Sequence, residues 1–308
     1  MFIKTFKQLS HKDAGSAGGK GASLGEMTKA NMSVPSGFVV LIAAFDRFLE
    51  ETDLSAEIAA VLKKVNYQDI NSVDKASNII RDLIYDQVIP ADLKKEILVE
   101  FKKLKAEFVA VRSSATAEDS AVASWAGELE TYLDTTEKRL VENIKKCWSS
   151  LFTPRAIFYR QAKGFLKTKV SVAVVVQEMI ESEVSGIVFT VHPVTKDKNQ
   201  LIIEAGWGLG EAIVSGQVTP DAYIIDKQNL SILDINIAKQ GMMIIRKAGG
   251  GVKRAAVVKT KQEKQKLSGR QIIELAKICL AIEKHYEKPQ DIEWPWLMAN
   301  FISPSPDR

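Results

Sequence analysis

The chain has 308 residues, of which 46% are hydrophobic and 26% charged, and its net charge at pH 7 is +4. This length allows two lobes with cores of their own, and the composition is that of a globular protein rather than a disordered one. The sequence has no apolar run of membrane-spanning length, and its start, "MFIKTFKQLSHKD", lacks a secretory apolar core. We therefore expect a cytoplasmic protein without a membrane partner. Because the Lys-rich stretches contain acids or lie on helical faces, we expect no nucleic-acid partner.

The first half of the sequence has a mainly helical pattern. Apolar residues recur three and four positions apart, and glycines open the helix expected at 19–32. The stretch "FVAVRSSA" (108–115) predicts a strand that ends in a polar turn. Further helices are expected at 38–51, 54–65, 72–86, 91–104, 137–152 and, with Pro154 at its start, 154–165.

The pattern changes near residue 170, where β-branched runs alternate with Gly, Pro, Asn and Lys turns. A long helix at 268–286, with Leu275, Cys279 and Ile282 on one face, precedes a last strand. We therefore expect an α+β chain with a mainly helical N-terminal lobe (1–170), a sheet-rich lobe (171–294) and an aberrant tail (295–308). The strands of the second lobe are expected at 170–180, 184–191, 199–206, 221–227 and 251–258.

The cysteines and histidines do not form a recognisable metal or catalytic motif. Cys147 and Cys279 lie far apart among apolar neighbours, so we expect buried free thiols rather than a disulfide or a zinc site. His11, His192 and His285 have no nearby partner in sequence that marks a base or a ligand. We expect each of them to be structural or exposed.

The stretch "SAGGKGASLGEM" is the first of four that could carry chemistry. Glycines before a helix leave backbone N–H groups accessible, and Lys20 adds a positive charge, a combination that suits a phosphate. The stretch does not match the GxxxxGK[ST] pattern of a Walker A loop. A plain flexible loop is the alternative.

The second stretch, "VRSSATAEDS", begins at the end of a predicted strand. Arg112 would stand there beside hydroxyl and backbone donors, an arrangement that recognises phosphate oxygens. The alternative is that Arg112 pairs with Glu118 or Asp119 on the surface.

The third stretch, "EAGWGLGEAIVSGQVTPD", is rich in glycine. So many glycines suggest a loop that something approaches closely, flanked by Glu204 and Glu211. Two successive turns between strands are the alternative. The glycines are Gly206, Gly208, Gly210 and Gly216.

The fourth stretch is "DIEW". In a strand, Asp291 and Glu293 face one side while Ile292 and Trp294 face the other. Two carboxylates on one face repel each other unless a cation lies between them, and Mg²⁺ bound to nucleotide phosphates is the usual solution. A surface strand edge is the alternative.

In this order and spacing, the four stretches resemble the N-terminal nucleotide-binding domain of the phosphoenolpyruvate synthase family. The segments "GGKGASLGEM", "VRSSATAEDS", "VVVQEMIESEVSGIVFTVHPVT", "IIEAGWGLGEAIVSGQVTPDAY" and "DIEW" carry the resemblance, which runs from about residue 5 to residue 294. The corresponding domains of pyruvate phosphate dikinase and of rifampicin phosphotransferases are similar as well. The resemblance implies a two-lobed ATP-grasp-like fold that binds Mg-ATP.

The resemblance also implies roles for individual residues. Lys20 and Arg112 would hold the ATP phosphates and spread the charge that develops during transfer, with Arg155 as a lesser phosphate ligand. Asp291 and Glu293 would hold Mg²⁺.

Other residues would bind the nucleoside. Gln177 and Met179 would line the adenine pocket, and Glu183 would accept hydrogen bonds from the ribose hydroxyls. The loop Gly206–Gly210 is expected near the phosphates.

The implied reaction passes a phosphoryl group from ATP to a histidine on a separate domain, so that ATP, pyruvate and water yield AMP, phosphoenolpyruvate and phosphate. Nothing in the sequence resembles the family's phosphohistidine signature or its pyruvate-binding barrel, so we expect these domains to act in trans or to be lost. His192, inside "FTVHPVT", should not be the phosphorylated residue. The alternatives are the ATP lobe of a rifampicin phosphotransferase or another dikinase, and a non-catalytic ATP-binding remnant.

The tail departs from the family pattern after Trp294. A turn, another strand and a Gln-Ser-Arg-Pro ending would be expected, but Pro295 is predicted to break the strand. The codons of the last residues can be chosen so that a shifted frame encodes the expected ending. Our hypothesis is that residues 295–308 are frameshifted translation, with weakened Mg-ATP binding as the expected consequence.

Overall fold

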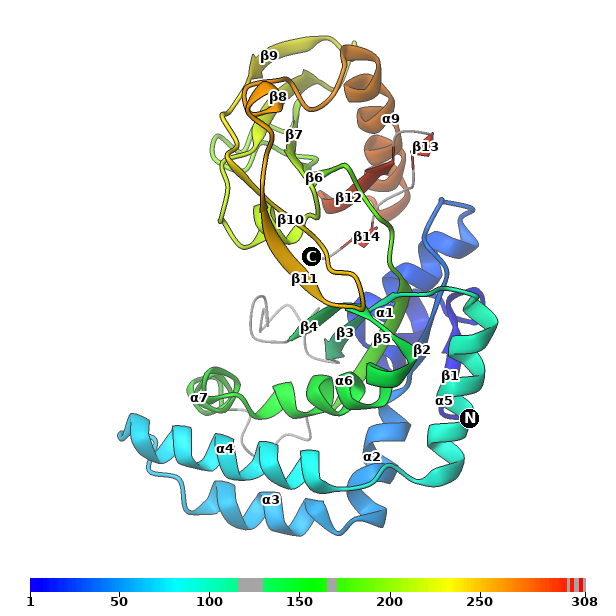
Figure 1. The fold of residues 1–308 in the computed structure, drawn as a ribbon, viewed down its shortest axis with the longest axis vertical. Helices are drawn as coiled ribbons and strands as arrows, with labels where there is room; N and C mark the ends of the chain where they lie inside the picture. Colours follow the sequence, from blue (N-terminus) through cyan, green and yellow to red (C-terminus); the bar gives the residue numbers. More distant parts are fainter. Residues whose placement is uncertain (116–129, 165–170, 298–299, 302–304, 307–308) are drawn as a thin grey trace. The chain divides into compact units, whose positions relative to one another are not determined.

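The chain forms two compact units, and each contains an antiparallel sheet of its own (Figure 1). The first unit comprises Met1–Asn31 and Ser36–Met179, and the second comprises Met32–Pro35 and Ile180–Arg308. The α+β class predicted from the sequence is confirmed. The computed structural model describes residues 1–115, 130–164, 171–297, 300–301 and 305–306.

The first unit is built on a five-stranded sheet in the order β1-β2-β5-β3-β4, in which all neighbouring strands are antiparallel. Its strands are β1 (Ile3–Thr5), β2 (Gly37–Val40), β3 (Val109–Ala115), β4 (Thr131–Thr135) and β5 (Val172–Glu178). Its helices are α1 (Ala14–Lys29), α2 (Ile42–Glu51), α3 (Leu54–Lys63), α4 (Ile70–Asp86), α5 (Ala91–Leu104), α6 (Glu137–Ser149) and α7 (Pro154–Ala162), with 3₁₀ turns at Phe6–Gln8, His11–Asp13 and Ser150–Phe152.

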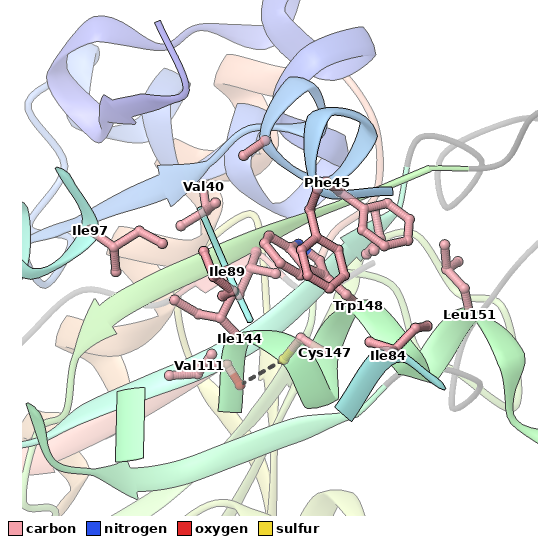
Figure 2. Packing of buried hydrophobic residues seen from close by; sticks show 14 of the residues in the cluster. Val40, Phe45, Ile84, Ile89, Ile97, Val111, Ile144, Cys147, Trp148 and Leu151 are labelled. Carbon is pink, nitrogen blue, oxygen red and sulfur yellow. Dashed lines mark hydrogen bonds between the residues drawn. The ribbon is translucent and has the colours of Figure 1, made fainter. Parts of the chain in front are cut away.

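One face of this sheet packs on the helices that follow β2. Alternate residues of β5 and β3, such as Val174, Val176 and Val111, enter a core that also contains side chains from these helices. Figure 2 shows this core around Trp148, which stacks at a tilt on Phe45 with 5.5 Å between ring centroids. The opposite face of the sheet is covered by α1.

Residues 38–41 correct one prediction. The sequence pattern indicates a single helix over 38–51, but Phe38–Val40 belong to β2, and α2 begins at Ile42. All four residues of β2 are buried, because Phe38 and Val40 face the core and Val39 packs against α1 on the other face. A short apolar run that is buried on both faces cannot be distinguished from a helix segment by periodicity alone.

The division between the units falls nine residues later than the boundary expected at 170/171, at Met179/Ile180. The physical reason is β5, which pairs with both β2 and β3 and is the central strand of the first sheet. The β-branched run at 172–176 therefore belongs to the first unit, although its composition resembles that of the later strands.

The second unit is built on a seven-stranded antiparallel sheet in the order β13-β12-β6-β7-β8-β9, with β14 also paired to β12. A separate ribbon is formed by β10 and β11. The strands are β6 (Val184–Phe189), β7 (Gln200–Trp207), β8 (Asp221–Asp226), β9 (Ile232–Asn236), β10 (Met242–Arg246), β11 (Val252–Ala256), β12 (Asp291–Leu297), β13 (Asn300–Phe301) and β14 (Ser305–Pro306), and the helices are α8 (Glu211–Val214) and α9 (Gly269–Tyr286), with a 3₁₀ turn at Lys259–Lys261.

The long predicted helix near the end of the chain is confirmed as α9. Ser268 caps it, because its hydroxyl accepts from the N–H of Gln271 at 3.4 Å while its own N–H donates to the Gln271 side chain at 2.7 Å. Leu275, Cys279 and Ile282 are fully buried on one face, as expected.

The expected strand break at Pro295 is wrong. β12 continues to Leu297, and its ladder with β6 passes through Pro295, which lies opposite Ser185. On the other edge of β12, β14 pairs with residues 292–293 and β13 pairs with residues 296–297. Pro295 lies between the two segments of β12 that pair with β14 and β13. Among the described residues it has no partner on that edge, so its missing N–H interrupts no ladder bond there.

Both cysteines are buried free thiols, as predicted. Burial raises the pKa of Cys147 to about 12, and burial also raises the pKa of Cys279. In the described part of the chain, no helix is both long enough and apolar enough to cross a membrane.

Candidate functional site

Arg112 and Gln177 lie on the same face of the first sheet. Arg112 on β3 pairs with Val175 on β5, and Gln177 follows two residues later on β5, opposite Ala110. Because directly paired residues of an antiparallel sheet point to the same side, both side chains are on the α1 face, opposite the core that contains Val174 and Val176. Gln177 is 5% exposed, so it lies well inside the unit.

Glycines bring the Lys20 segment of α1 against this face. Gly18 has a left-handed φ of +68° and interrupts α1, and a Cβ at this position would overlap Ser114. Gly21 packs on Val39, where a Cβ would lie 3.0 Å from the valine Cγ2. Lys20 is therefore held between two points at which the helix touches the sheet that carries Arg112.

The hydroxyls that follow Arg112 are used inside the unit. Ser114 accepts a hydrogen bond from the N–H of Gly21 at 3.3 Å. Ser113 lies on the core side, where its hydroxyl is 3.0 Å from that of Ser150 and bonds the carbonyl of Glu130 at 3.1 Å. The sequence predicted serine hydroxyls as donors beside Arg112. In the structure, the hydroxyls of Ser113 and Ser114 already have partners within the unit. The alternative partners Glu118 and Asp119 lie outside the described residues.

Cys147 packs on the core side of this part of β3. Burial is the main cause of its raised pKa, and the hydrogen bond with Ser113 and the charge of Lys20 oppose that shift. Cys147 itself donates to the carbonyl of Val111 at 3.7 Å (Figure 2). The Cys147 thiol thus packs against β3 one residue before Arg112, on the core face.

Arg155 and Met179 are the remaining predicted residues of the first unit. Arg155 is exposed at the start of α7, where the Thr153 hydroxyl caps the helix by accepting from the N–H of Ala156 at 3.1 Å. Met179 follows β5, and its N–H donates to the carbonyl of Phe108 at 3.0 Å. Met179 thus lies at the same end of the sheet as Gln177.

In the second unit, Asp291 and Glu293 alternate with buried residues of β12. Ile292 is fully buried and Trp294 is 2% exposed, whereas both carboxylates are partly exposed on the other face. The predicted alternation is therefore confirmed. The buried face carries Ile203 and Tyr223 as well, on the side where α9 contacts β7.

The face that carries these carboxylates also holds Glu204. Glu293 pairs with Ile187, and Ile187 pairs with Glu204, so the three side chains form a row across β12, β6 and β7. Burial raises the pKa of Glu204. From the sequence, Glu204 was predicted only as a flank of the glycine-rich stretch, although its place in the alternation of "LIIEAG" puts it on this face.

Asp291 and Glu293 suit a hard cation. Carboxylate oxygens are the preferred ligands of Mg²⁺, which commonly takes one or two of them and completes its shell with phosphates and water. Within the ranges that the structure describes, no three His, Cys, Asp or Glu side chains converge on one point. The two carboxylates of this face therefore suit a metal ion that is also bound by phosphate oxygens. They suit less well a metal ion whose ligands all come from the protein.

The glycine-rich loop is approached closely, as predicted, but by another part of the same unit. Gly208 has a φ of +86°, and a Cβ there would lie 2.5 Å from the carbonyl oxygen of Ile244 on β10. The N–H groups of Trp207, Gly208 and Leu209 donate to Gln240, Glu183 and Ile244 at 2.8, 2.8 and 2.9 Å. These three N–H groups are therefore already hydrogen-bonded within the second unit.

Glu183 immediately precedes β6, directly beside this loop. Its carbonyl accepts the Gly208 N–H, and its side chain is exposed. The Ser185 hydroxyl donates to the Gly208 carbonyl at 2.6 Å and fixes the loop from the other side. The structure thus joins Glu183 to the glycine loop through the backbone.

Residues 14–299 match the family model described as "Pyruvate phosphate dikinase, AMP/ATP-binding domain". A probable phosphoenolpyruvate synthase of Methanocaldococcus jannaschii is 46% identical over 97% of this chain, and another of Archaeoglobus fulgidus is 46% identical over 96%. A rifampicin phosphotransferase of Bacillus subtilis is 39% identical over 90% of the chain.

These relatives are considerably longer than this chain. The match covers 26% of the Methanocaldococcus protein, 40% of the Archaeoglobus protein and 32% of the Bacillus protein. The family match covers nearly the whole chain, and the resemblance noted from the four motifs is thereby confirmed. The chain belongs to the AMP/ATP-binding domain family of pyruvate phosphate dikinase, whose fold is ATP-grasp-like.

Proposed function

We propose that this chain is the ATP-binding phosphotransferase lobe of a phosphoenolpyruvate synthase-type enzyme, which passes a phosphoryl group from Mg-ATP to a histidine on a companion domain. The observation that carries the proposal is the shared face of the first sheet, on which Gly18 and Gly21 hold the Lys20 segment against the strands of Arg112 and Gln177. The names of the relatives support the enzyme class.

Lys20 and Arg112 act as the phosphate ligands in this proposal. A guanidinium bonds two phosphate oxygens at once, and an ammonium adds a mobile point charge. Both charges stabilise the negative charge that spreads over the oxygens during phosphoryl transfer. Arg155 is a further candidate, since it lies exposed at the start of α7.

Gln177, Met179 and Glu183 bind the nucleoside. Gln177 offers an amide that can both donate to and accept from an adenine edge, and Met179 offers a polarisable apolar surface. The exposed Glu183 carboxylate accepts hydrogen bonds from ribose hydroxyls.

Asp291 and Glu293 hold the magnesium ion. When bound, Mg²⁺ neutralises phosphate charge and orients the reacting oxygens. The contribution of the chain is to keep both carboxylates on one face through the alternation of β12. In the loop Gly206–Gly210, the residues Trp207, Gly208 and Leu209 contribute by positioning rather than by amide donation, since their N–H groups already donate elsewhere.

A calorimetric titration tests the binding roles. Lys20→Met and Arg112→Met should each weaken ATP about 10- to 100-fold, because each removes a charged hydrogen bond. Lys29→Met, at the exposed end of the same helix, and Arg139→Met, exposed on α6, are matched controls with the same loss of charge. Equal affinities in all five proteins would refute these roles.

Magnesium binding is tested separately. Asp291→Asn should raise the Mg²⁺ concentration needed for half-maximal ATP binding about tenfold, whereas Glu274→Gln on the exposed face of α9 should not. If Asp291→Asn leaves the Mg²⁺ requirement unchanged, the metal lies elsewhere.

The acceptor is tested by supplying it. The relatives extend well beyond the matched region, so their remaining parts can be expressed without their own ATP-binding domain and mixed with this chain. Transfer of label from phosphorus-labelled ATP to a histidine of that fragment supports the synthase assignment. Transfer to rifampicin favours the alternative, for which the Bacillus relative is the specific support. ATP binding without transfer to either acceptor would identify a non-catalytic remnant.

A further inference from the structure

Residues 239–265 form an arm that leaves the second sheet and returns to it. The arm begins after β9, carries the β10–β11 ribbon, and ends before α9 (Figure 1). Ala238 precedes the arm and Lys266 follows it. The two ends are therefore separated by the entire ribbon in sequence.

The carboxylate of Asp221, the first residue of β8, binds both ends of this arm. Its Oδ1 accepts from the N–H of Ala238 at 2.9 Å, and its Oδ2 accepts from the N–H of Lys266 at 3.0 Å. The Lys266 ammonium donates to Asp221 Oδ1 and to the carbonyl of Ala238, both at 2.7 Å. The side chains of Asp221 and Lys266 are 0% exposed, so the whole clamp is out of contact with water.

Tyr223 completes this clamp from the same strand. Its hydroxyl donates to Asp221 Oδ2 at 2.8 Å and accepts from the N–H of Leu267 at 3.2 Å. Burial, reinforced by the hydrogen bond to Asp221, raises the pKa of Tyr223, so it remains a donor. Buried ion pairs contribute little net stability in general, and specifying one geometry is their best-attested use.

The arm in turn holds the glycine-rich loop. The Gln240 side chain accepts from the N–H of Trp207 at 2.8 Å and donates to the carbonyls of Trp207 and Met242 at 3.0 and 2.9 Å. The Ile244 carbonyl accepts the N–H of Leu209 at 2.9 Å. The arm therefore supplies the partners of two loop amides, those of Trp207 and Leu209, while Glu183 and Ser185 hold Gly208.

We propose that Asp221 is a positioning residue for the nucleotide site. By joining Ala238 to Lys266 it fixes the arm, the arm fixes the loop at Trp207–Leu209, and the loop bonds the backbone of Glu183. This inference rests on the proposed function for its effect on ATP, but its structural part can be measured without ATP.

Asp221→Asn tests the proposal, because the amide keeps the size of the side chain and removes one acceptor and the charge. Glu283→Gln is the matched control: Glu283 forms a partly buried ion pair with Lys227, just after the same strand, at 2.5 Å. Amide hydrogen exchange is followed at Trp207 and Leu209 and, as an internal reference, at Ile202–Glu204 in the middle of β7. ATP affinity is measured on the same proteins.

Asp221→Asn should speed exchange at Trp207 and Leu209 about tenfold relative to the reference amides, and it should weaken ATP about 5- to 20-fold. Glu283→Gln should do neither. The double variant Asp221→Asn with Lys266→Met removes the unpaired buried ammonium. It should recover resistance to urea without recovering loop protection or ATP affinity.

A purely structural role predicts another pattern. Exchange would then rise equally at the loop and at the reference amides, and the double variant would recover ATP affinity together with stability. Either result overturns the proposal, as does unchanged ATP affinity in Asp221→Asn when the wild type binds ATP. If the wild type binds no ATP, the proposed function fails, and the exchange data alone decide whether Asp221 positions the loop.

Discussion

In the first unit the candidate phosphate ligands lie where a helix packs on a sheet, whereas in the second unit the candidate metal ligands lie on the partly exposed face of a sheet. The first arrangement depends on glycines: Gly18 and Gly21 let α1 approach β3 and β2, and Lys20 lies between these contacts. The second depends only on strand alternation, which places Asp291 and Glu293 opposite Ile292 and Trp294. Close packing therefore determines the geometry of one set of residues, and the pleat determines that of the other.

This difference has a practical consequence for substitutions. Adding a side chain at a packed glycine such as Gly18 displaces the backbone, because the nearest atoms include backbone atoms and not only the end of a flexible side chain. A change at an exposed carboxylate alters charge and leaves the backbone where it was. Substitutions can therefore separate packing effects from charge effects in both units.

The largest effect is expected from Gly186→Ala in the middle of β6. A Cβ there would overlap the carbonyl oxygen of Glu204 and approach the ring of Trp294 at 2.8 Å, so packing also limits the second unit at this position. We expect the free energy of unfolding to fall by about 3 kcal/mol or more. Urea denaturation measures this loss. Gly241→Ala is the control, since no atom lies within 4 Å of its added Cβ, and it should change stability by less than about 1 kcal/mol.

A smaller effect is expected from Gly18→Ala in α1. The residue has a left-handed φ of +68°, and its Cβ would meet Ser114. We expect a loss of about 2 kcal/mol in the free energy of unfolding, accompanied by weaker ATP binding because the Lys20 segment is displaced. Gly15→Ala on the same helix, where the added Cβ meets nothing within 4 Å, should affect neither quantity by much. Unchanged stability in Gly18→Ala would contradict the packing account of the first unit.

The smallest effect is expected from Glu204→Gln. Burial raises the pKa of Glu204 above the usual value of 4.5, so the ionised carboxylate costs stability at neutral pH. The variant should be more stable than the wild type at pH 7.5, by less than about 1 kcal/mol. As the pH falls through the raised pKa towards 4.5, the wild type gains protons in the folded state and recovers this difference.

Thermal unfolding of both proteins at several pH values measures the trend. Glu274→Gln, an exposed position on α9, controls for a general loss of negative charge. An advantage of Glu204→Gln that grows as the pH is lowered would have the wrong sign and would reject this account of Glu204.

Much of the fold was predictable because it rests on local patterns. The alternation in "DIEW" and the periodicity of 268–286 each fix which side chains are buried, and β12 and α9 confirm both. Proline carried a misleading signal at Pro295, since its effect depends on whether the outer edge of the strand pairs at that position. Similarly, the composition of 38–41 did not reveal that β2 lies between two other strands.

The candidate site was predictable in its residue types but not in its contacts. The glycines of "GGKG" suggested a phosphate loop, whereas Gly18 and Gly21 also serve close packing against Ser114 and Val39. The clamp at Asp221 left no recognisable pattern in the sequence, because its partners lie 17 and 45 residues away along the chain. Hydrogen bonds over such separations are fixed by topology, which no local pattern encodes.

The central claim is that Lys20 and Arg112 hold the nucleotide phosphates. A crystal structure of the chain with Mg²⁺ and a non-hydrolysable ATP analogue tests it most directly. We predict phosphate oxygens within hydrogen-bond distance of the Lys20 ammonium and the Arg112 guanidinium, and a metal ion on Asp291 and Glu293. A nucleotide bound with its phosphates away from both basic side chains would contradict the account.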